Sequence, residues 1–299
     1  MDFFLNTYRT LLKTLKTKNF YFYTFYEFLQ RKQTLVTPLV ILRHDVDRLP
    51  NNALKMATLE KELGIQSTYY FRAISGIFRQ DIIQQIADMG HEIGYHYEDM
   101  SLAARKKVSI EPGIMIKKVV EGSQYAETHN QQPVISNKKI KVETLIDKGY
   151  ELFRQHLKQF RQYYSIKTIC MHGSPRSKWD SRDIWKKYDY KNLDIVGEPY
   201  FDVDYNQVLY LTDTGRRWDG WKMNIRDKVA NQEKWKNKGY VFHSTKDIIR
   251  AANNKMLPNK IMINTHPQRW TDKPLPWVKE LVWQNIKNMG KFIIVKMRG

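Results

Sequence analysis

Carboxylate and imidazole side chains follow several short apolar or β-branched segments of this chain, at positions where strands are expected to end. They are Asp45 and Asp47, His96 with Glu98, His172, Asp213 and His266. Because the carboxyl ends of parallel strands meet at one edge of a sheet, we expect these side chains to converge. Such groups are the ligands that a divalent metal requires, and they are also the general acids and bases that hydrolysis requires.

The spacing of Asp45 and Asp47 is itself informative. In an extended segment residues i and i+2 point to the same side, so both carboxylates can reach one site while Val46 packs behind them. Two carboxylates this close do not both stay ionised at low cost unless a cation lies between or beside them. A solvated surface turn can have the same Asp-x-Asp sequence, but the apolar segment directly before it favours the functional interpretation.

Strands and helices alternate along the chain, as they do in α/β proteins with a parallel sheet. Apolar or β-branched runs predict strands at 39–42, 67–71, 92–95, 167–171 and 260–264. Apolar residues at helical spacing predict helices at about 52–63, after the cap residue Asp81, and from about 143 onward. The irregular stretch 101–143 is expected to be a surface insertion.

The composition is that of a folded domain. A chain of 299 residues with 42% hydrophobic and 13% aromatic residues can bury a sizeable core, which excludes disordered, collagenous and low-complexity proteins. The single cysteine, Cys170, excludes a disulfide scaffold. We expect one catalytic domain over 1–299 with an N-terminal extension at 1–36. The first residues lack a secretory signal pattern and no stretch reaches about 18 apolar residues, so a soluble, cytoplasmic protein is expected.

The net charge of +19 predicts attraction to polyanions. The basic residues lie in short, scattered clusters, which is more typical of a solvated surface than of a nucleic-acid-binding stripe. We therefore expect no specific nucleic acid partner. A phosphate-bearing substrate and peripheral contact with an anionic membrane both remain open, as does the oligomeric state.

Taken in order, these motifs resemble the polysaccharide deacetylase family, the NodB homology domain of carbohydrate esterase family 4. The matching segments are Asp45-x-Asp47 after an apolar strand, the strand at 67–71, Gly-His-Glu-Ile-Gly-Tyr-His at 90–96 and Ile-Asn-Thr-His at 263–266. The match covers 39–97 strongly and the remainder only by scattered motifs. The resemblance implies a distorted (β/α)7 barrel that removes N- or O-acetyl groups from sugars with a divalent metal.

The resemblance also implies roles for individual residues. Asp45 would be the base that deprotonates the attacking water, and His266 would be the acid that protonates the leaving group. Asp47 and His96 would bind the metal, for which zinc is the expected ion. His172 follows the strand end that corresponds to the family's Arg-Pro-Pro segment, so it would orient Asp45, complete the metal site, or simply pack in a turn.

One departure from the family concerns the metal. The family's second metal-binding histidine falls at Met100, and a thioether is a poor ligand for a hard or borderline ion. Either another side chain completes the ligand set or the metal is lost. We rank Glu98 ahead of Asp99 for this position because its side chain reaches farther. The alternative function is a metal-independent barrel hydrolase that cleaves another non-peptide carbon–nitrogen bond with the same Asp and His pair.

Other residues are candidates for contact with substrate. Asp213 and Trp218 partly resemble the family's motif that shapes the acetyl pocket, although the Trp lies one position too far along. Trp218 and Trp270 could stack on sugar rings, or could equally belong to the core. Arg217 could bind a phosphate or uronate through paired hydrogen bonds. The expected partner is an acetylated sugar or glycan intermediate, with or without phosphate, in the biosynthesis of a bacterial surface glycan.

Overall fold

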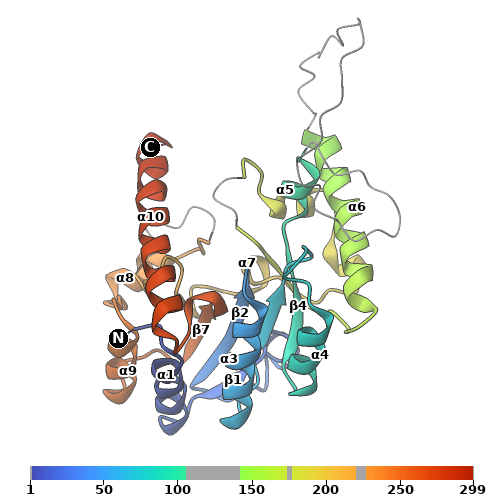
Figure 1. Ribbon diagram of the computed structural model, residues 1–299. Helices are drawn as coiled ribbons and strands as arrows, with labels where there is room; N and C mark the ends of the chain where they lie inside the picture. The colour runs from blue at the N-terminus through green and yellow to red at the C-terminus, as the bar shows by residue number, and fades with distance from the viewer. Residues whose placement is uncertain (1, 106–141, 174–176, 220–226, 299) are drawn as a thin grey trace, which may run out of the picture.

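A seven-stranded parallel sheet with helices packed on it forms the body of the protein (Figure 1). The structure, a computed structural model, describes residues 2–105, 142–173, 177–219 and 227–298, with side chains to Met289. The strands are β1 (Tyr21–Tyr23), β2 (Leu39–Val46), β3 (Thr68–Phe71), β4 (Glu92–Tyr97), β5 (Ile169–Met171), β6 (Leu209–Thr212) and β7 (Lys260–Thr265). The α-helices are α1 (Leu5–Thr17), α2 (Phe25–Gln30), α3 (Pro50–Glu62), α4 (Gln80–Asp88), α5 (Asp99–Ala103), α6 (Val142–Arg161), α7 (Pro199–Asp202), α8 (Gln232–Asn237), α9 (Thr245–Asn253) and α10 (Pro274–Arg298). Short 3-10 helices are η1 (Ser181–Lys186), η2 (Tyr190–Leu193) and η4 (Pro267–Arg269).

The strands follow the order β5-β4-β3-β2-β7-β6, and every pairing is parallel. β1 adds a seventh strand, which pairs with the first half of β2 while β3 pairs with the second half. Within the described residues no ladder joins β5 to β6, so the curled sheet does not close. The expected α/β class and distorted barrel are confirmed.

Alternation along β2 explains how one strand serves both core and site. Leu39 and Ile41 pack on the inner face of the curled sheet, whereas Val40 and Leu42 join a cluster on its outer face. All eight residues of β2 are buried. The same period of two carries Asp45 to the inner face at the carboxyl end of the strand.

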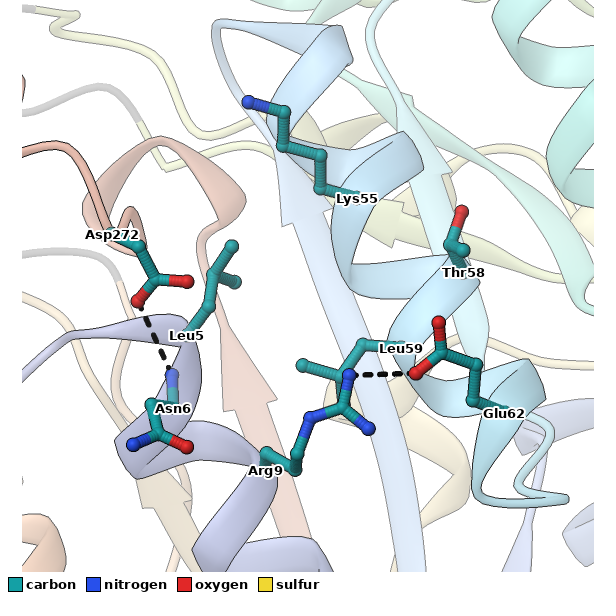
Figure 2. A pocket seen from close by; sticks show the side chains of 8 residues that line it. All are labelled: Leu5, Asn6, Arg9, Lys55, Thr58, Leu59, Glu62 and Asp272. Carbon is teal, nitrogen blue, oxygen red and sulfur yellow. Dashed lines mark hydrogen bonds and ion pairs between the residues drawn. The ribbon is translucent and has the colours of Figure 1, made fainter.

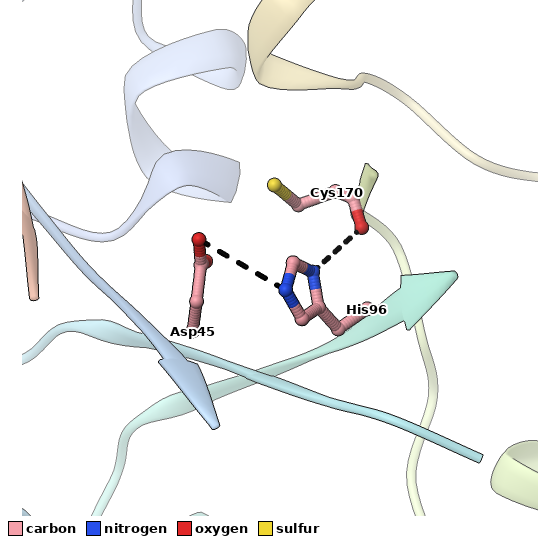
Figure 3. Close-up of side chains that lie close together, drawn as sticks. All are labelled: Asp45, His96 and Cys170. Carbon is pink, nitrogen blue, oxygen red and sulfur yellow. Dashed lines mark hydrogen bonds and ion pairs between the residues drawn. The ribbon is translucent and has the colours of Figure 1, made fainter. Parts of the chain in front are cut away.

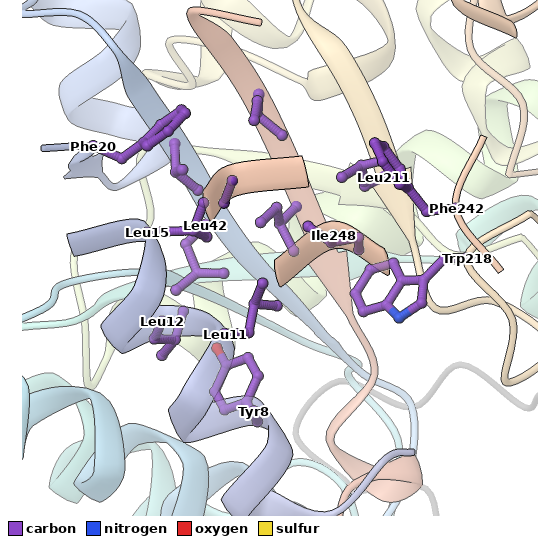
Figure 4. Close-up of a cluster of buried hydrophobic side chains, with 14 of the residues drawn as sticks. Tyr8, Leu11, Leu12, Leu15, Phe20, Leu42, Leu211, Trp218, Phe242 and Ile248 are labelled. Atoms are coloured by element: carbon purple, nitrogen blue, oxygen red, sulfur yellow. The ribbon is translucent and has the colours of Figure 1, made fainter. Parts of the chain in front are cut away.

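The N-terminal segment is an integral part of this core. Figure 4 shows a buried cluster in which Tyr8, Leu11 and Leu12 of α1 pack with Leu42 of β2 and Ile248 of α9. Burial on the sheet stabilises α1, since an isolated helix of this length is marginal in water. The segment expected as an extension at 1–36 therefore contributes a strand and a helix that the domain needs.

Some expected boundaries were wrong. Helix α4 begins at Gln80 with Arg79 as its N-cap, and Asp81 lies in the first turn, where it pairs with Arg79 instead of capping the helix. β4 runs to Tyr97, so His96 lies inside the strand. The ends of the segment expected as an insertion are helical, because 101–103 belong to α5 and α6 begins at Val142. Residues 106–141 lie outside the described part of the chain.

Two long helices stand on opposite sides in Figure 1, with the sheet between them. α6 has 20 residues and α10 has 25 residues. None of the helices in the described ranges has both the length and the hydropathy of a membrane span.

Candidate active site

The carboxyl ends of the central strands carry the site. Asp45 and Asp47 come from the end of β2, His96 from β4, His172 from just after β5, and His266 from just after β7. The Nε2 atoms of the three histidines each lie 3.4–3.9 Å from an Asp47 carboxylate oxygen. The convergence expected from the strand pattern is present.

Asp47, His96 and His172 form a compact triad. Asp47 Oδ1 lies 3.4 Å from His96 Nε2 and 3.4 Å from His172 Nε2, and the three ligand atoms all lie within 4.8 Å of one another. Burial alone would raise the pKa of Asp47, but the His172 charge and contact with His96 hold it well below its usual range. Asp47 Oδ1 is buried and has no hydrogen-bond partner. The other oxygen, Oδ2, accepts a hydrogen bond from Gln268 at 3.3 Å. An ionised carboxylate with one buried, unsatisfied oxygen is the state expected of a metal ligand.

The second nitrogen of each ring explains why both Nε2 atoms face Asp47. His96 Nδ1 lies 2.9 Å from the carbonyl oxygen of Cys170, which can only accept a hydrogen bond, so Nδ1 carries the proton. His172 Nδ1 lies 3.2 Å from Glu98 Oε2. The hydrogen bond of His96 selects the tautomer whose Nε2 lone pair is available to a metal, and the Glu98 carboxylate beside His172 Nδ1 favours the same tautomer there.

Glu98 lies behind His172 and outside the triad. Arg72 donates to Glu98 Oε1 from Nε at 2.8 Å and from Nη2 at 2.5 Å, and it also donates to the Asp47 carbonyl at 3.2 Å. Burial opposes ionisation of Glu98, but His172 and then Arg72 bring its pKa to about 2. With Oε1 held by Arg72 and Oε2 at 3.2 Å from His172 Nδ1, Glu98 lies on the far side of His172 from the ligand atoms around Asp47.

Met100 and Asp99 point into the core. Met100 is fully buried with Leu145 and Ile184 against α6. Asp99 is also fully buried, and it accepts hydrogen bonds from Tyr95 and from the ring of His156 at 2.7 Å. The chain enters α5 at Asp99, which directs both side chains away from the triad.

Two polar side chains hold the carboxylate of Asp45 in place. Asn264 Nδ2 donates to Asp45 Oδ2 at 2.9 Å, and Arg43 Nη2 lies 3.7 Å from the same oxygen. Burial would raise the pKa of Asp45, but the charges of Arg43, His96 and His266 together lower it below its ordinary value. The other oxygen, Oδ1, is buried without a hydrogen-bond partner. The carboxylate of Asp45 is therefore ionised, and its Oδ2 faces His96 Nε2 at 4.0 Å and His266 Nε2 at 3.9 Å.

A second group of potential ligands consists of Asp45, His96 and Cys170, drawn in Figure 3. Burial raises the pKa of the Cys170 thiol well above its ordinary value, so the sulfur stays protonated. Arg43 Nη1 also contacts that sulfur at 2.6 Å. A protonated thiol that already contacts a cation is a poor ligand, so the triad around Asp47 is the better metal site.

His266 is oriented by Asp213. Its Nδ1 lies 2.6 Å from Asp213 Oδ1 and 2.7 Å from Arg269 Nη1, and its backbone N–H donates to Asp213 Oδ2 at 3.0 Å. Arg269 and Trp270 hold the same carboxylate at 2.5 and 2.7 Å. These contacts leave His266 Nε2 facing the site, 3.9 Å from Asp45 Oδ2 and 3.9 Å from Asp47 Oδ2.

The expected substrate contacts lie elsewhere. Asp213 and Trp270 are fully buried. Trp218 is largely buried beside Phe3 and Trp270, and it also lines a separate pocket of about 390 Å³ with Tyr210, Thr212 and Asp227. Asp213 serves His266 instead. Arg217 is exposed and pairs with Asp219 at 2.9 Å.

Three residues of the site carried a signal that sequence reasoning passed over. Arg43 interrupts an apolar strand two positions before Asp45, so the alternation rule puts both side chains on one face. Asn264 lies two positions before His266 and is fully buried, and Arg72 directly follows β3. Polar residues in buried strands near a charged site could have identified them.

The pocket in Figure 2 lies apart from this site. It lies between α1 and α3 and has a volume of about 310 Å³. Arg9 and Glu62 in its wall form an ion pair at 2.6 Å, and the Asn6 backbone N–H donates to Asp272. None of the triad residues lines it.

The comparisons with known proteins come from solved structures. No protein-family model and no curated protein sequence matches the chain. One match is a mutant of BA3943, described as a CE4 family pseudoenzyme with restored enzymatic activity, at 9% identity and a TM-score of 0.39 over 84% of this chain and 63% of that chain. Another is a family 4 acetyl xylan esterase from Clostridium thermocellum in complex with a cobalt ion, at 16% identity and a TM-score of 0.33 over 84% of each chain. This chain thus spans less than two thirds of the first of these structures. By their descriptions, both are members of the family that the motifs of this chain resemble, carbohydrate esterase family 4.

Proposed function

We propose that this protein is a metal-dependent hydrolase that removes an acetyl group from a sugar or a glycan intermediate. The observation that carries the proposal is the triad of Asp47, His96 and His172, with its buried, unsatisfied carboxylate oxygen, beside Asp45 and His266. The motif resemblance supports the acetylated sugar as substrate.

The residues present fit a divalent ion. Two imidazole nitrogens and one carboxylate oxygen form a three-ligand set of the kind that would bind zinc in a hydrolase. His172 thus takes the position that Met100 cannot fill. A bound ion of this kind would polarise the acyl oxygen and the attacking water.

The proton transfers belong to the side chains around the triad. Asp45 accepts the proton of the attacking water, while Asn264 and Arg43 fix its carboxylate through Oδ2. His266 donates a proton from Nε2 to the departing nitrogen or oxygen of the sugar. Asp213 holds the His266 ring in place through its contact with Nδ1.

The net positive charge of the protein favours a substrate that carries phosphate. A cytoplasmic enzyme would meet sugar nucleotides or lipid-linked glycans, and both carry phosphates that a protein of net charge +19 attracts. An N-acetyl sugar in the biosynthesis of a surface glycan is the substrate class that we favour.

Metal analysis of the purified full chain tests the proposal. Protein prepared without chelator is expected to hold close to one equivalent of zinc or a similar divalent ion. Asp47→Ala, His96→Ala and His172→Ala are each expected to lose it. His243→Ala is the matched control, because His243 is exposed and pairs with Asp219 away from the site.

Activity is then tested by acetate release from N-acetylated sugars, with and without chelator. Loss of release on chelation and its return with added zinc would support the metal-dependent reaction. Wild-type protein that binds no metal after incubation with zinc, cobalt or nickel would contradict it. Release that persists under those conditions would instead support the metal-independent hydrolase with Asp45 and His266.

A further inference from the structure

Helix α10 carries an apolar stripe on its outer face. The large apolar residues exposed on it are Leu275 (75%), Val278 (49%), Val282 (53%), Trp283 (47%), Ile286 (52%) and Met289 (66%). At about 100° of rotation per residue, all of them except Trp283 fall within an arc of about 80°. Trp283 borders this arc, which we call the α10 stripe.

The stripe points away from the protein body. Gln284 on the other side of the helix is almost fully buried, and Trp277 donates its indole N–H to the backbone of Asp2. Glu280 also faces the body and pairs with Arg48 at 3.2 Å. The helix is thus attached through these polar contacts and through stacking of Trp277 on Phe4, and it presents further apolar side chains outward, where an ordinary surface helix is polar.

The charge of the helix is strongly one-sided. Glu280 is its only acidic residue, and its carboxylate is engaged by Arg48 and by Lys287 at 3.9 Å. Beyond Glu280 the sequence to residue 299 contains no Asp or Glu. The exposed Lys279 lies next to the stripe, and Lys287 lies over the ring of Trp283.

We propose that the α10 stripe docks the protein on an anionic lipid surface. Leu, Val, Ile and Met side chains along one arc, a Trp at its edge and lysines beside it are the features of a helix that lies in the plane of a membrane interface. Each lysine near such a surface adds attraction to anionic headgroups, and the net charge of +19 adds a longer-range attraction. This inference is independent of the proposed reaction.

A second copy of the chain fits the stripe less well. Pairing two α10 helices through their stripes would bring the exposed Lys279 of each helix to the edge of the seam, while Glu280 and Lys287 pair with each other toward the body. Like charges beside a helix seam oppose association. Anionic headgroups meet the same lysines with the opposite charge.

Vesicle co-sedimentation of the full chain tests the proposal. One set of vesicles contains phosphatidylcholine alone, and the other contains phosphatidylcholine mixed with phosphatidylserine. The wild type is expected to sediment with the mixed vesicles, less so as salt is raised. Val282→Ser combined with Ile286→Ser is expected to weaken partitioning about tenfold or more, because both side chains lie in the centre of the stripe.

Matched variants distinguish binding through the α10 stripe from nonspecific adsorption to the vesicles. Met256→Ser removes an equally exposed apolar side chain outside α10, and it is expected to leave vesicle binding unchanged. Lys279→Gln is expected to weaken binding to the mixed vesicles, whereas Lys13→Gln on the exposed side of α1 is not. Circular dichroism melting of each variant shows whether it is folded.

Two results would overturn the proposal. One is binding to the mixed vesicles that the double stripe variant leaves unchanged. The other is a wild-type dimer in analytical ultracentrifugation that the double variant converts to a monomer, with no vesicle binding by either protein. That second result would assign the stripe to a second copy of the chain.

Discussion

Glu98 lies beside Nδ1 of His172, the ring nitrogen that does not face Asp47. Its Oε2 lies 3.2 Å from His172 Nδ1, and Arg72 holds the opposite oxygen. A carboxylate at this distance favours the ring orientation in which Nε2 faces Asp47. In the proposed metal site, Glu98 would thus tune metal affinity without binding the ion.

Replacing Glu98 by Gln is therefore expected to weaken metal binding by about 10- to 100-fold without abolishing it. The measurement is a competition titration with a chromophoric zinc chelator. His172→Ala should lose far more affinity than Glu98→Gln, since it removes a ligand. Equal losses in the two variants would contradict the positioning role and would restore Glu98 as a direct ligand.

Asp213 positions His266 in a similar way. Asp213→Asn keeps the size of the side chain but removes the charge that holds the His266 Nδ1 proton. We expect kcat for acetate release to fall by about a hundredfold or more, the usual worth of a general acid, with KM little changed.

The chain offers a matched control for this prediction. Asp219 contacts the ring of His243 at 2.7 Å, and His243 lies on the surface with its side chain 74% exposed. Asp219→Asn is expected to leave kcat unchanged. A rise in KM with unchanged kcat in Asp213→Asn would assign Asp213 to substrate binding instead.

Strand β4 depends on close contact between Gly94 and its neighbour strand. A Cβ added at Gly94 would overlap the ring of Tyr70 on β3 and would lie 3.1 Å from the carbonyl of Thr168. Two positions further along the same face lies His96. The glycine thus lets the inner face close around Tyr70 just below the triad.

Gly94→Ala is expected to lower the free energy of unfolding by about 1–3 kcal/mol, since overpacking forces the strand or the ring to shift. Urea denaturation measures this loss. A double-mutant cycle with Tyr70→Leu tests the cause, because removing the ring should reduce the cost of the added methyl group. Strictly additive losses would contradict the proposed contact.

A buried polar cluster at the outer face of the sheet joins helices and strands from distant parts of the chain. Glu60 of α3 accepts hydrogen bonds from Tyr8 of α1 at 2.5 Å and from Ser67 at 2.6 Å. It also lies 2.9 Å from His44 of β2, and all of these groups are fully or almost fully buried. One carboxylate therefore connects the first helix, the third helix and the central strand.

This cluster predicts a pH dependence of stability. Burial would raise the pKa of Glu60, but His44 and then His91 and Ser67 lower it from 4.5 to about 2. The folded state thus keeps the carboxylate charged at a pH where the unfolded chain takes up a proton. The stabilisation is complete above pH 4.5 and is lost as the pH falls toward 2.

Glu60→Gln removes the titrating group. We expect it to lower the free energy of unfolding by roughly 3 kcal/mol at neutral pH, and the difference from the wild type to shrink below pH 4.5. Urea denaturation across this pH range measures both quantities. Glu62→Gln, a change at an exposed neighbour, should alter stability by less than about 0.5 kcal/mol. A difference that stays constant with pH would show that Glu60 does not titrate as described.

Much of the site could be predicted from local patterns. The apolar run before Asp45 predicts a buried strand, and the spacing of Asp45 and Asp47 puts both on one face. Parallel strands with their carboxyl ends at one edge then predict that His96 and His266 lie near them. These inferences succeed for two reasons. The alternation of side chains along a strand depends only on adjacent residues, and the strands of an α/β sheet run parallel, so their carboxyl ends share one edge.

Other features depended on which distant strands become neighbours. His172 faces Asp47 because β5 pairs with β4, and Asp213 reaches His266 because β6 pairs with β7. Local sequence does not encode these pairings, which arise when all the helices and strands are packed together. The burial of Trp218 and Trp270 follows from the same packing, because the free energy of burying an indole depends on what surrounds it. Residue types and spacing thus determined the chemistry available to this chain, and tertiary packing decided which side chains were brought within reach of one another.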